Sequence, residues 1–281
     1  MKDLDEQKKI AVLIDADNAQ HSRIKAVLAE IATHGHIITK RAYGDWSRNN
    51  LRAWKSILNE YSIQPIQQFA YTTGKNSTDA SMIIDAMDLL YTEKYDSFVL
   101  VSSDSDFTKL ASRLREAEKF VFGVGEAKTP SAFRNACDDF ILVENLDRDS
   151  KETEATAKAT KATANPVATT AATPKSAVRA KNTRNTKTTK QKETALGTPA
   201  IDEVINLLDI ASDKFADEDG WTDVSAAGNY IKRSMPDFDT RTYGFQKLSD
   251  LIANLMENFE IKRTSGKGAG NIVTYKKIDR S

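Results

Sequence analysis

The first 146 residues alternate short apolar runs with amphipathic segments, and this alternation restricts the fold more than any other feature of the chain. Runs such as "KIAVLIDA" and "SFVLVSS" are largely apolar and rich in β-branched residues, as expected of strands buried on both faces. Segments with helical periodicity, such as "AQHSRIKAVLAEIATHG", separate the runs. Regular alternation of this kind predicts an α/β fold in which a parallel sheet is sandwiched by helices.

The apolar and amphipathic segments give expected bounds for each element of this first domain. The expected strands are 9–16, 37–43, 63–69, 97–103, 120–125 and 139–145. The expected helices are 19–35, 47–61, 77–93, 105–118 and 128–138. Ser47 is a plausible N-cap of the second helix, and Thr129 and Pro130 fit the cap and first turn of the fifth.

Residues 149–198 have a composition unlike that of the flanking sequence. They are mostly Ala, Thr, Lys and Asn, and they contain no aromatic residue. Such a segment cannot bury enough apolar surface to offset the entropy of ordering, so we predict a disordered linker. The whole chain has a net charge of zero, yet residues 151–198 hold 10 basic and 3 acidic residues. The linker is either a solubilising tether or one that also attracts nucleic acid.

The last part of the chain, residues 199–278, has a different pattern. Three amphipathic segments at 200–216, 221–236 and 239–261 predict helices. Two alternating segments around a Gly/Lys-rich turn, within 259–277, predict a β-hairpin. Three helices followed by a hairpin are typical of a winged helix-turn-helix domain.

Acidic side chains gather where ligands bind in an open parallel sheet, at the carboxyl ends of the strands. Asp15 follows the first expected strand, Asp104 and Asp106 follow the fourth, and Asp79 begins a helix at the same end. These like charges would destabilise the fold unless a cation neutralised them. Mg²⁺ prefers carboxylate oxygens, and such an ion supports attack of water on a phosphodiester. We therefore expect a divalent metal site here.

Helix capping is an alternative role for each of these acids taken singly. Asp79 and Asp106 fall in first helical turns, where a negative charge is favourable without any metal. Asp17 alternates with Asp15 and is expected to point away from the site. Asp85 lies nearly two turns beyond Asp79 and is expected to support it.

The residues around these acids resemble a known family. "VLIDADN", "KNSTDASMIIDAMDLL" and "FVLVSSDSDFTKLASRLREAEKFVFGVGE" look like the NYN domain of the PIN-like nuclease superfamily, over residues 8–146. The resemblance implies a Mg²⁺- or Mn²⁺-dependent ribonuclease, that is, a phosphodiester hydrolase. Asp15, Asp79, Asp104 and Asp106 would be its catalytic and metal-binding acids. Asn18, Ser102 and Ser103 would be polar supports for metal or phosphate.

The C-terminal part resembles a second family that is associated with RNA. "PDFDTRTYGFQKLSDLI" is similar to the core of the OST-HTH, or LOTUS, domain, and the resemblance spans residues 199–278. Basic residues near the helices and hairpin, and one before Asp79, are candidates for RNA contact, although they fit ordinary surface charges equally well. These candidates are Lys75, Lys232, Arg233, Arg241, Lys247, Lys262, Arg263 and Lys267.

Several other classes of protein are disfavoured by motifs that the sequence lacks. Neither a Walker A motif nor a complete dinucleotide-binding glycine pattern is present. With one cysteine and three scattered histidines, the sequence disfavours a zinc site. The single cysteine excludes an internal disulfide and suits the reducing cytoplasm. No apolar run reaches the ~18 residues of a membrane helix, and the charged N-terminus gives no sign of a signal peptide.

Three interpretations of function stay open at this point. The first is a metal-dependent endoribonuclease acting on single-stranded or structured RNA that the LOTUS domain presents. The second is an RNA-binding regulator with a weak site, and the third is an adaptor whose LOTUS domain binds a protein. A DNA nuclease is a weaker option. Members of the PIN-like class often dimerise, so a homodimer through the NYN domain is a further expectation.

Overall fold

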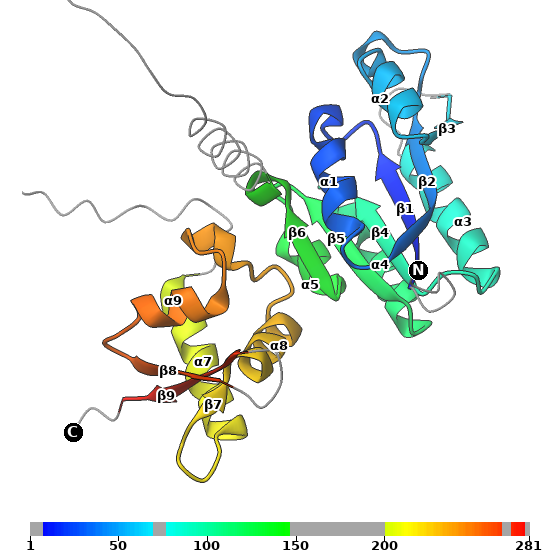
Figure 1. Cartoon of the computed structure of the whole chain (residues 1–281). Coiled ribbons are helices and arrows are strands. Elements are labelled where there is room, and N and C mark those ends of the chain that lie inside the picture. Colours follow the sequence, from blue (N-terminus) through cyan, green and yellow to red (C-terminus); the bar gives the residue numbers. More distant parts are fainter. Residues whose placement is uncertain (1–7, 70–76, 147–199, 266–270, 279–281) are drawn as a thin grey trace, which may run out of the picture.

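The chain folds into two units, each with its own hydrophobic core (Figure 1). The structure is a computed structural model that describes residues 8–69, 77–146, 200–265 and 271–278. The first unit ends at residue 146 and the second begins at residue 200. The predicted linker, 149–198, lies outside the described residues, as do Lys75 and Lys267.

The first unit is built on a six-stranded parallel sheet, which confirms the predicted fold class. The strand order is β3-β2-β1-β4-β5-β6. β1 and β4 are therefore the two central strands. The strands that follow β1 extend the sheet to one edge, and those that follow β4 extend it to the other. The strands are β1 (Lys9–Asp15), β2 (His36–Gly44), β3 (Gln64–Gln67), β4 (Ser97–Val101), β5 (Phe120–Gly125) and β6 (Asp139–Leu142).

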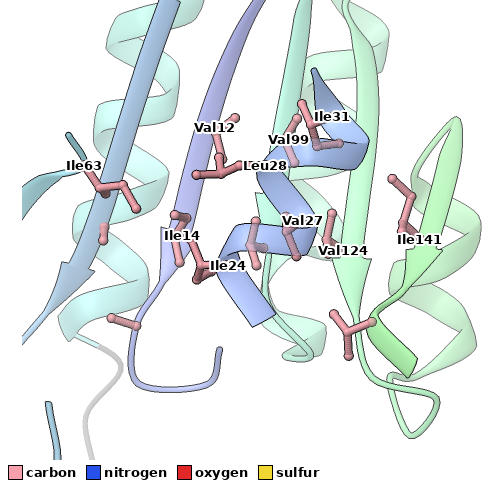
Figure 2. Packing of buried hydrophobic residues seen from close by; sticks show 14 of the residues in the cluster. Val12, Ile14, Ile24, Val27, Leu28, Ile31, Ile63, Val99, Val124 and Ile141 are labelled. Atoms are coloured by element: carbon pink, nitrogen blue, oxygen red, sulfur yellow. The ribbon is translucent and has the colours of Figure 1, made fainter. Parts of the chain in front are cut away.

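Both faces of this sheet are buried, because alternate residues of the central strands enter different cores. Val12 and Ile14 of β1 pack with α1 (Ile24–Ile31), as Figure 2 shows, and the neighbouring α2 (Trp54–Glu60) covers the same face. Ala11 and Leu13 enter the core of the opposite face. The helices over that face are α3 (Ser77–Tyr91), α4 (Thr108–Glu116) and α5 (Ser131–Ala136). Burial on both faces explains the continuous apolar runs of the sequence.

Two predicted helix starts are wrong. The helix expected from Ser47 begins only at Trp54, after the short 3₁₀ turn η3 (Asn49–Leu51). The Ser47 hydroxyl instead donates to Oδ1 of Asp45 at 2.5 Å, which holds this segment in a turn. In the fifth helix Pro130 occupies the N-cap position, so Thr129 is not the cap. Two further 3₁₀ turns, η2 (His21–Arg23) and η4 (Ser105–Phe107), precede α1 and α4.

The second unit combines helices with a three-stranded antiparallel sheet of order β7-β9-β8. The hairpin was predicted, but the single helix expected over 239–261 is wrong. Gly244 has a φ of +87°, a left-handed conformation that ends η5 and separates it from α9. The elements are α7 (Ile201–Phe215), β7 (Thr222–Asp223), α8 (Val224–Ser234), η5 (Thr240–Tyr243), α9 (Leu248–Asn254), β8 (Phe259–Ser265) and β9 (Asn271–Lys277).

None of the helices in the described ranges combines the length and the apolar character that crossing a bilayer requires.

Candidate metal centre

The acidic residues lie where the strand order of the first unit reverses, between β1 and β4. Connections leave these two strands in opposite directions, and this opens a crevice at their carboxyl ends. The register pairs Ile14 of β1 with Val101 of β4. The next residues, Asp15 and Ser102, therefore meet at the rim of the sheet.

Three carboxylates converge at this rim. Asp79 belongs to the first turn of α3, Asp104 is the N-cap of η4, and Asp106 lies within η4. One carboxylate oxygen from each lies within 4.8 Å of the others. This set contains only oxygen ligands, which fits a hard divalent cation such as Mg²⁺ or Mn²⁺. Two segments that are distant in the sequence thus form one acidic cluster.

The pKa of Asp79 records the crowding of negative charge at this cluster. Burial raises it first, and the nearby carboxylates of Asp15, Asp104, Asp106 and Asp17 raise it further, to about 6. The side chain of Asp79 is only 8 % exposed. Without a nearby positive charge, these surroundings shift this carboxyl group toward its protonated form. A bound cation would favour the ionised form instead.

Asp15 stands behind the cluster and is fully buried. Its Oδ2 accepts hydrogen bonds from Asn18 Nδ2 at 2.7 Å and from the Ser102 hydroxyl at 2.8 Å. Its Oδ1 accepts the backbone amides of Asp17 and Asn18. Burial nevertheless raises the pKa of Asp15 above its usual value, because these hydrogen bonds offset the lost hydration only in part. The Asp15 carboxyl group, at the end of β1, thus lies close enough to Asp79 of α3 to raise the pKa of Asp79.

Capping and clustering of the acids coexist in the structure. Oδ1 of Asp104 accepts the amide of Asp106 at 2.9 Å, so this side chain does cap η4. The same residue contributes a carboxylate oxygen to the acidic cluster. Helix capping therefore fixes the position of a residue that faces two other acids.

The supporting residues expected from the sequence have different positions. Asn18 and Ser102 contact Asp15 directly, whereas the Ser103 hydroxyl accepts the amide of Glu126 and holds the end of β5. Asp85 lies deeper, where it pairs with Arg41 and accepts the hydroxyl of Tyr43.

Asp17 takes part in this region more than its sequence position indicated. β1 ends at Asp15, so Asp17 lies in the turn that follows the strand, and strand alternation does not set the direction of its side chain. The Thr78 hydroxyl donates to Oδ2 of Asp17 at 3.1 Å and joins that turn to the start of α3. Two acids separated by one residue, Asp15 and Asp17, and a helix expected to begin at residue 77 were the sequence features that could have indicated this contact.

An open hollow of about 530 Å³ adjoins the acidic cluster. Asp79 and Asp106 line its inner side, Ile83 of α3 lines its apolar part, and Lys109 of α4 contributes an exposed ammonium group. Its size is in the range of pockets that take small organic ligands. A second open hollow of about 780 Å³ lies at the amino ends of the strands, around Lys8, Asp96 and Phe120, away from the acids.

The candidate RNA-binding residues of the second unit fall into two groups. Arg233, Lys247 and Lys262 are exposed, and Lys262 lies 5.4 Å from the centre of the Trp221 ring. Arg263 is also exposed, and it pairs with Asp250 at 3.3 Å. Exposed cations are accessible to a phosphate backbone.

Lys232 and Arg241 form the second group, because each meets an acid of the first unit. Lys232 pairs with Asp139, and Arg241 pairs with Glu30 at 3.3 Å. Their positions therefore differ from those of ordinary surface cations.

Comparison with family models agrees with this geometry. Residues 9–146 match the NYN domain, and residues 200–269 match the OST-HTH/LOTUS domain. The chain thus combines an NYN domain with an OST-HTH/LOTUS domain, as the sequence resemblance indicated. These two domains support a nuclease or RNA-associated role.

Of the curated proteins and the solved structures compared with the chain, only solved structures match it. No curated protein matches the chain. A crystal structure of a protein of unknown function from Vibrio parahaemolyticus is 20% identical, with a TM-score of 0.41, and the match covers 50% of this chain and 96% of that chain. A solution structure of an uncharacterized protein from Nitrosomonas europaea is 23% identical, with a TM-score of 0.27, and covers 37% of this chain and 95% of that chain.

Proposed function

We propose that this protein is a metal-dependent endoribonuclease that hydrolyses phosphodiester bonds of RNA. The observation that carries the proposal is the convergence of Asp79, Asp104 and Asp106 at the point where the strand order reverses. Three carboxylates within 4.8 Å of one another repel each other when no cation is bound, and together they can coordinate a divalent cation. The NYN domain match supports the same reaction class.

The residues of this centre would have different roles. Asp79, Asp104 and Asp106 would hold one or two Mg²⁺ or Mn²⁺ ions, with Asp15 as the fourth acid of the site. A divalent ion there would supply a hydroxide-like nucleophile and positive charge beside the phosphate. Asn18 and Ser102 orient Asp15 and favour its ionised form through their hydrogen bonds. Ser103 would support the site indirectly, by holding the neighbouring loop through Glu126.

The substrate would approach along surfaces of both domains. The hollow of about 530 Å³ offers apolar surface to a nucleotide next to the acids, with Lys109 near its phosphate. The exposed cations Arg233, Lys247 and Lys262 of the LOTUS domain would contact the RNA backbone. A basic linker over 149–198 would raise the local concentration of RNA, and Lys75 and Lys267 keep their predicted role as RNA contacts.

Cellular location and assembly complete the proposal. The single cysteine, Cys137, is fully buried, and burial raises the pKa of its thiol to about 12, so it is unreactive. We propose a cytoplasmic location on this ground. A homodimer through the NYN domain stays a prediction.

Incubation of the purified protein with RNA tests the proposal. Single-stranded and structured RNA, and DNA of the same sequence, would be incubated with Mg²⁺, with Mn²⁺ and with EDTA. The wild type would be compared with Asp104→Asn and with Asp88→Asn, a control that removes an exposed acid of α3. We expect ion-dependent cleavage of RNA that Asp104→Asn abolishes and Asp88→Asn preserves.

Other outcomes of this experiment would point elsewhere. RNA binding without cleavage in any protein would contradict the nuclease proposal and favour an RNA-binding regulator. Cleavage of DNA alone would contradict the assigned substrate. Absence of RNA binding at any salt concentration would favour a LOTUS domain that binds a protein.

A further inference from the structure

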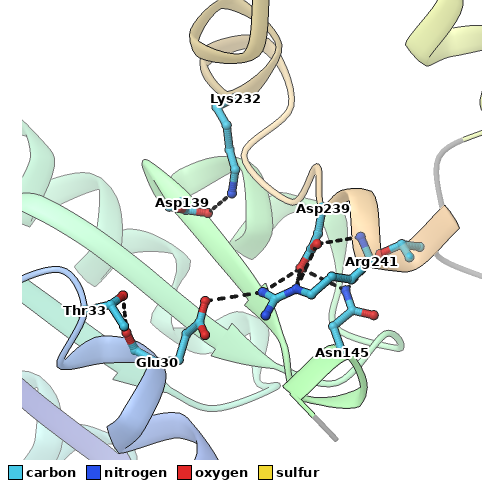
Figure 3. A network of polar contacts seen from close by, with 8 residues as sticks. Glu30, Thr33, Asp139, Asn145, Lys232, Asp239 and Arg241 are labelled. Atoms are coloured by element: carbon cyan, nitrogen blue, oxygen red, sulfur yellow. Dashed lines mark hydrogen bonds and ion pairs between the residues drawn. The ribbon is translucent and has the colours of Figure 1, made fainter. Parts of the chain in front are cut away.

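Three ion pairs join the LOTUS domain to the NYN domain beside strand β6, and Figure 3 shows the two that involve Lys232 and Arg241. Arg134 of α5 pairs with Asp237 at 2.6 Å, and both side chains are nearly buried, at 11 % and 10 % exposure. Lys232, near the end of α8, pairs with Asp139 at the start of β6. Arg241 of η5 reaches Glu30 of α1 at 3.3 Å. Positive charges are thus contributed from both sides of the contact.

Neutral groups complete the contact between the two domains. The backbone N–H of Phe140 in β6 donates to the carbonyl of Pro236 at 2.9 Å. Asn145 Nδ2 donates to Oδ2 of Asp239 at 3.1 Å and to Oγ1 of Thr242 at 2.9 Å. These contacts involve a backbone group and a short side chain, which hold the partners in one orientation.

The carboxylate of Asp239 is the centre of the network that Figure 3 shows. Burial alone would raise its pKa, but Arg241 and Asn145 outweigh burial and hold the pKa below its usual value. Arg241 lies 2.9 Å from Asp239 and 3.3 Å from Glu30, so it links an acid of each domain. The side chain of Arg241 is only 16 % exposed, which leaves little room for a phosphate.

We propose that residues 232–242 form a docking surface for the NYN domain of the same chain, and that Lys232 and Arg241 serve this contact rather than RNA. Reciprocal charge is the main argument, because Arg134 meets an acid of the LOTUS domain while Lys232 and Arg241 meet acids of the NYN domain. Because each domain contributes both positive and negative groups, other orientations of the two domains would bring like charges together and are disfavoured. The partner is the same chain because covalent linkage gives the two domains a high effective concentration.

The docked arrangement determines which cations of the LOTUS domain stay accessible to RNA. Lys247 and Lys262 lie on the loop before α9 and on β8, outside the docking surface, and both are exposed. Arg233 falls within 232–242 but is exposed, and it is not one of the residues that pair with the NYN domain in the three ion pairs. A phosphate backbone can reach these three cations while the domains stay docked.

Amide hydrogen exchange of Phe140 reports on this contact without any RNA. Its N–H bonds to Pro236 across the contact, whereas the N–H of Val121 bonds to Asp138 within the NYN domain and serves as a reference. Exchange would be followed by NMR in the full chain for Lys232→Asp, Asp139→Lys and the double variant. We expect each single change to accelerate exchange at Phe140 roughly tenfold, and the double variant to restore protection. Val121 should stay protected throughout.

Several results would overturn the proposal. Unchanged protection of Phe140 in both single variants would show that the ion pair does not hold the domains together. Protection that grows with protein concentration would place the partner in a second copy of the chain. Unfolding of the NYN domain in a variant would appear at Val121, and wild-type protein at increasing salt would then supply the test, since salt should accelerate Phe140 alone.

RNA affinity gives an independent readout for the two cations. Lys232→Asp and Lys262→Asp remove similar charges, and only the second lies outside the docking surface. We expect Lys262→Asp to weaken RNA binding more strongly. Equal weakening with unchanged exchange at Phe140 would make Lys232 an RNA contact. If the wild-type protein does not bind RNA either, the proposed function on RNA fails, while hydrogen exchange still decides whether the domains dock.

Discussion

The hydroxyl of Ser102 donates a hydrogen bond of 2.8 Å to Oδ2 of Asp15, across the two strands between which the sheet order reverses. Both residues are buried. The same hydroxyl accepts the amide of Asp104 at 3.1 Å. One serine thus connects the acid that follows β1 to the acid that follows β4, so the geometry of the candidate centre depends on a group that is itself not charged.

Replacement of Ser102 by alanine should therefore disturb Asp15. The hydrogen bond from Ser102 lowers the pKa of Asp15, so its loss should raise that pKa further. The free energy of unfolding should fall by about 1–2 kcal/mol, because a buried carboxylate loses a donor. Urea denaturation would measure the loss. Ser112→Ala, at an exposed position of α4, is the matched control and should change stability by less than about 0.5 kcal/mol. Equal effects of the two changes would argue against a special role for Ser102.

Stability of the ion-free protein should depend on pH through Asp79. Its pKa is raised from 3.8 to about 6, so the folded state binds a proton that the unfolded chain releases. The stabilisation from that proton is complete below pH 3.8 and is lost as the pH rises to about 6. At pH 7 Asp79→Asn should be more stable than wild type by up to about 3 kcal/mol.

Urea unfolding at several pH values, with a chelator present, would measure this difference. The gap between Asp79→Asn and wild type should widen from pH 4 to pH 6 and then stay constant. Asp88→Asn, on the exposed face of α3, should follow the wild-type profile. Parallel profiles for Asp79→Asn and wild type would contradict the raised pKa.

Divalent ions should stabilise the wild-type protein at neutral pH. Binding to the folded state alone adds about 2.7 kcal/mol when the ion concentration is 100 times its Kd. Thermal unfolding with Mg²⁺ or Mn²⁺ should therefore show a rise in Tm that Asp104→Asn removes and Asp88→Asn retains. Persistence of the full rise in Asp104→Asn would place the ion elsewhere.

Asp85 should matter for folding rather than for ion binding. It accepts the hydroxyl of fully buried Tyr43 and pairs with Arg41, and all three side chains belong to the contact between β2 and α3. Removal by Asp85→Ala should cost about 3 kcal/mol, since it leaves Tyr43 and Arg41 without their acceptor. The rise in Tm on adding Mg²⁺ should survive in this variant. A variant that kept its stability but lost the response to Mg²⁺ would return Asp85 to the candidate centre.

Much of the first domain could be predicted because its constraints are local. β1 and β4 are apolar without interruption since helices cover both faces of the sheet, and parallel strands bring their carboxyl ends to one rim. These two facts placed Asp15, Asp79, Asp104 and Asp106 near one another before any coordinates were known. The raised pKa of Asp79 agrees with the crowding of like charges that the sequence indicated.

Other features depend on partners that are distant in sequence. Asp85 was expected to support the acids because it follows Asp79 on one helix, but strand β2 supplies Arg41 and Tyr43 at that depth. Lys232 lies 93 residues from its partner Asp139, and Arg241 lies 211 residues from Glu30. Helical periodicity and charge cannot reveal such pairs, since they arise only when two separate cores are placed together.

The hydrogen bond from Phe140 to Pro236 has a consequence for self-association. β6 and β3 are the two edges of the sheet, and an unpaired edge strand can recruit a strand from another molecule. β3 contains Pro65, which lacks a donor and blunts that edge. The LOTUS domain covers part of the β6 edge through Pro236. An NYN domain separated from the LOTUS domain would expose this edge, so we expect the isolated first domain to self-associate more readily than the full chain.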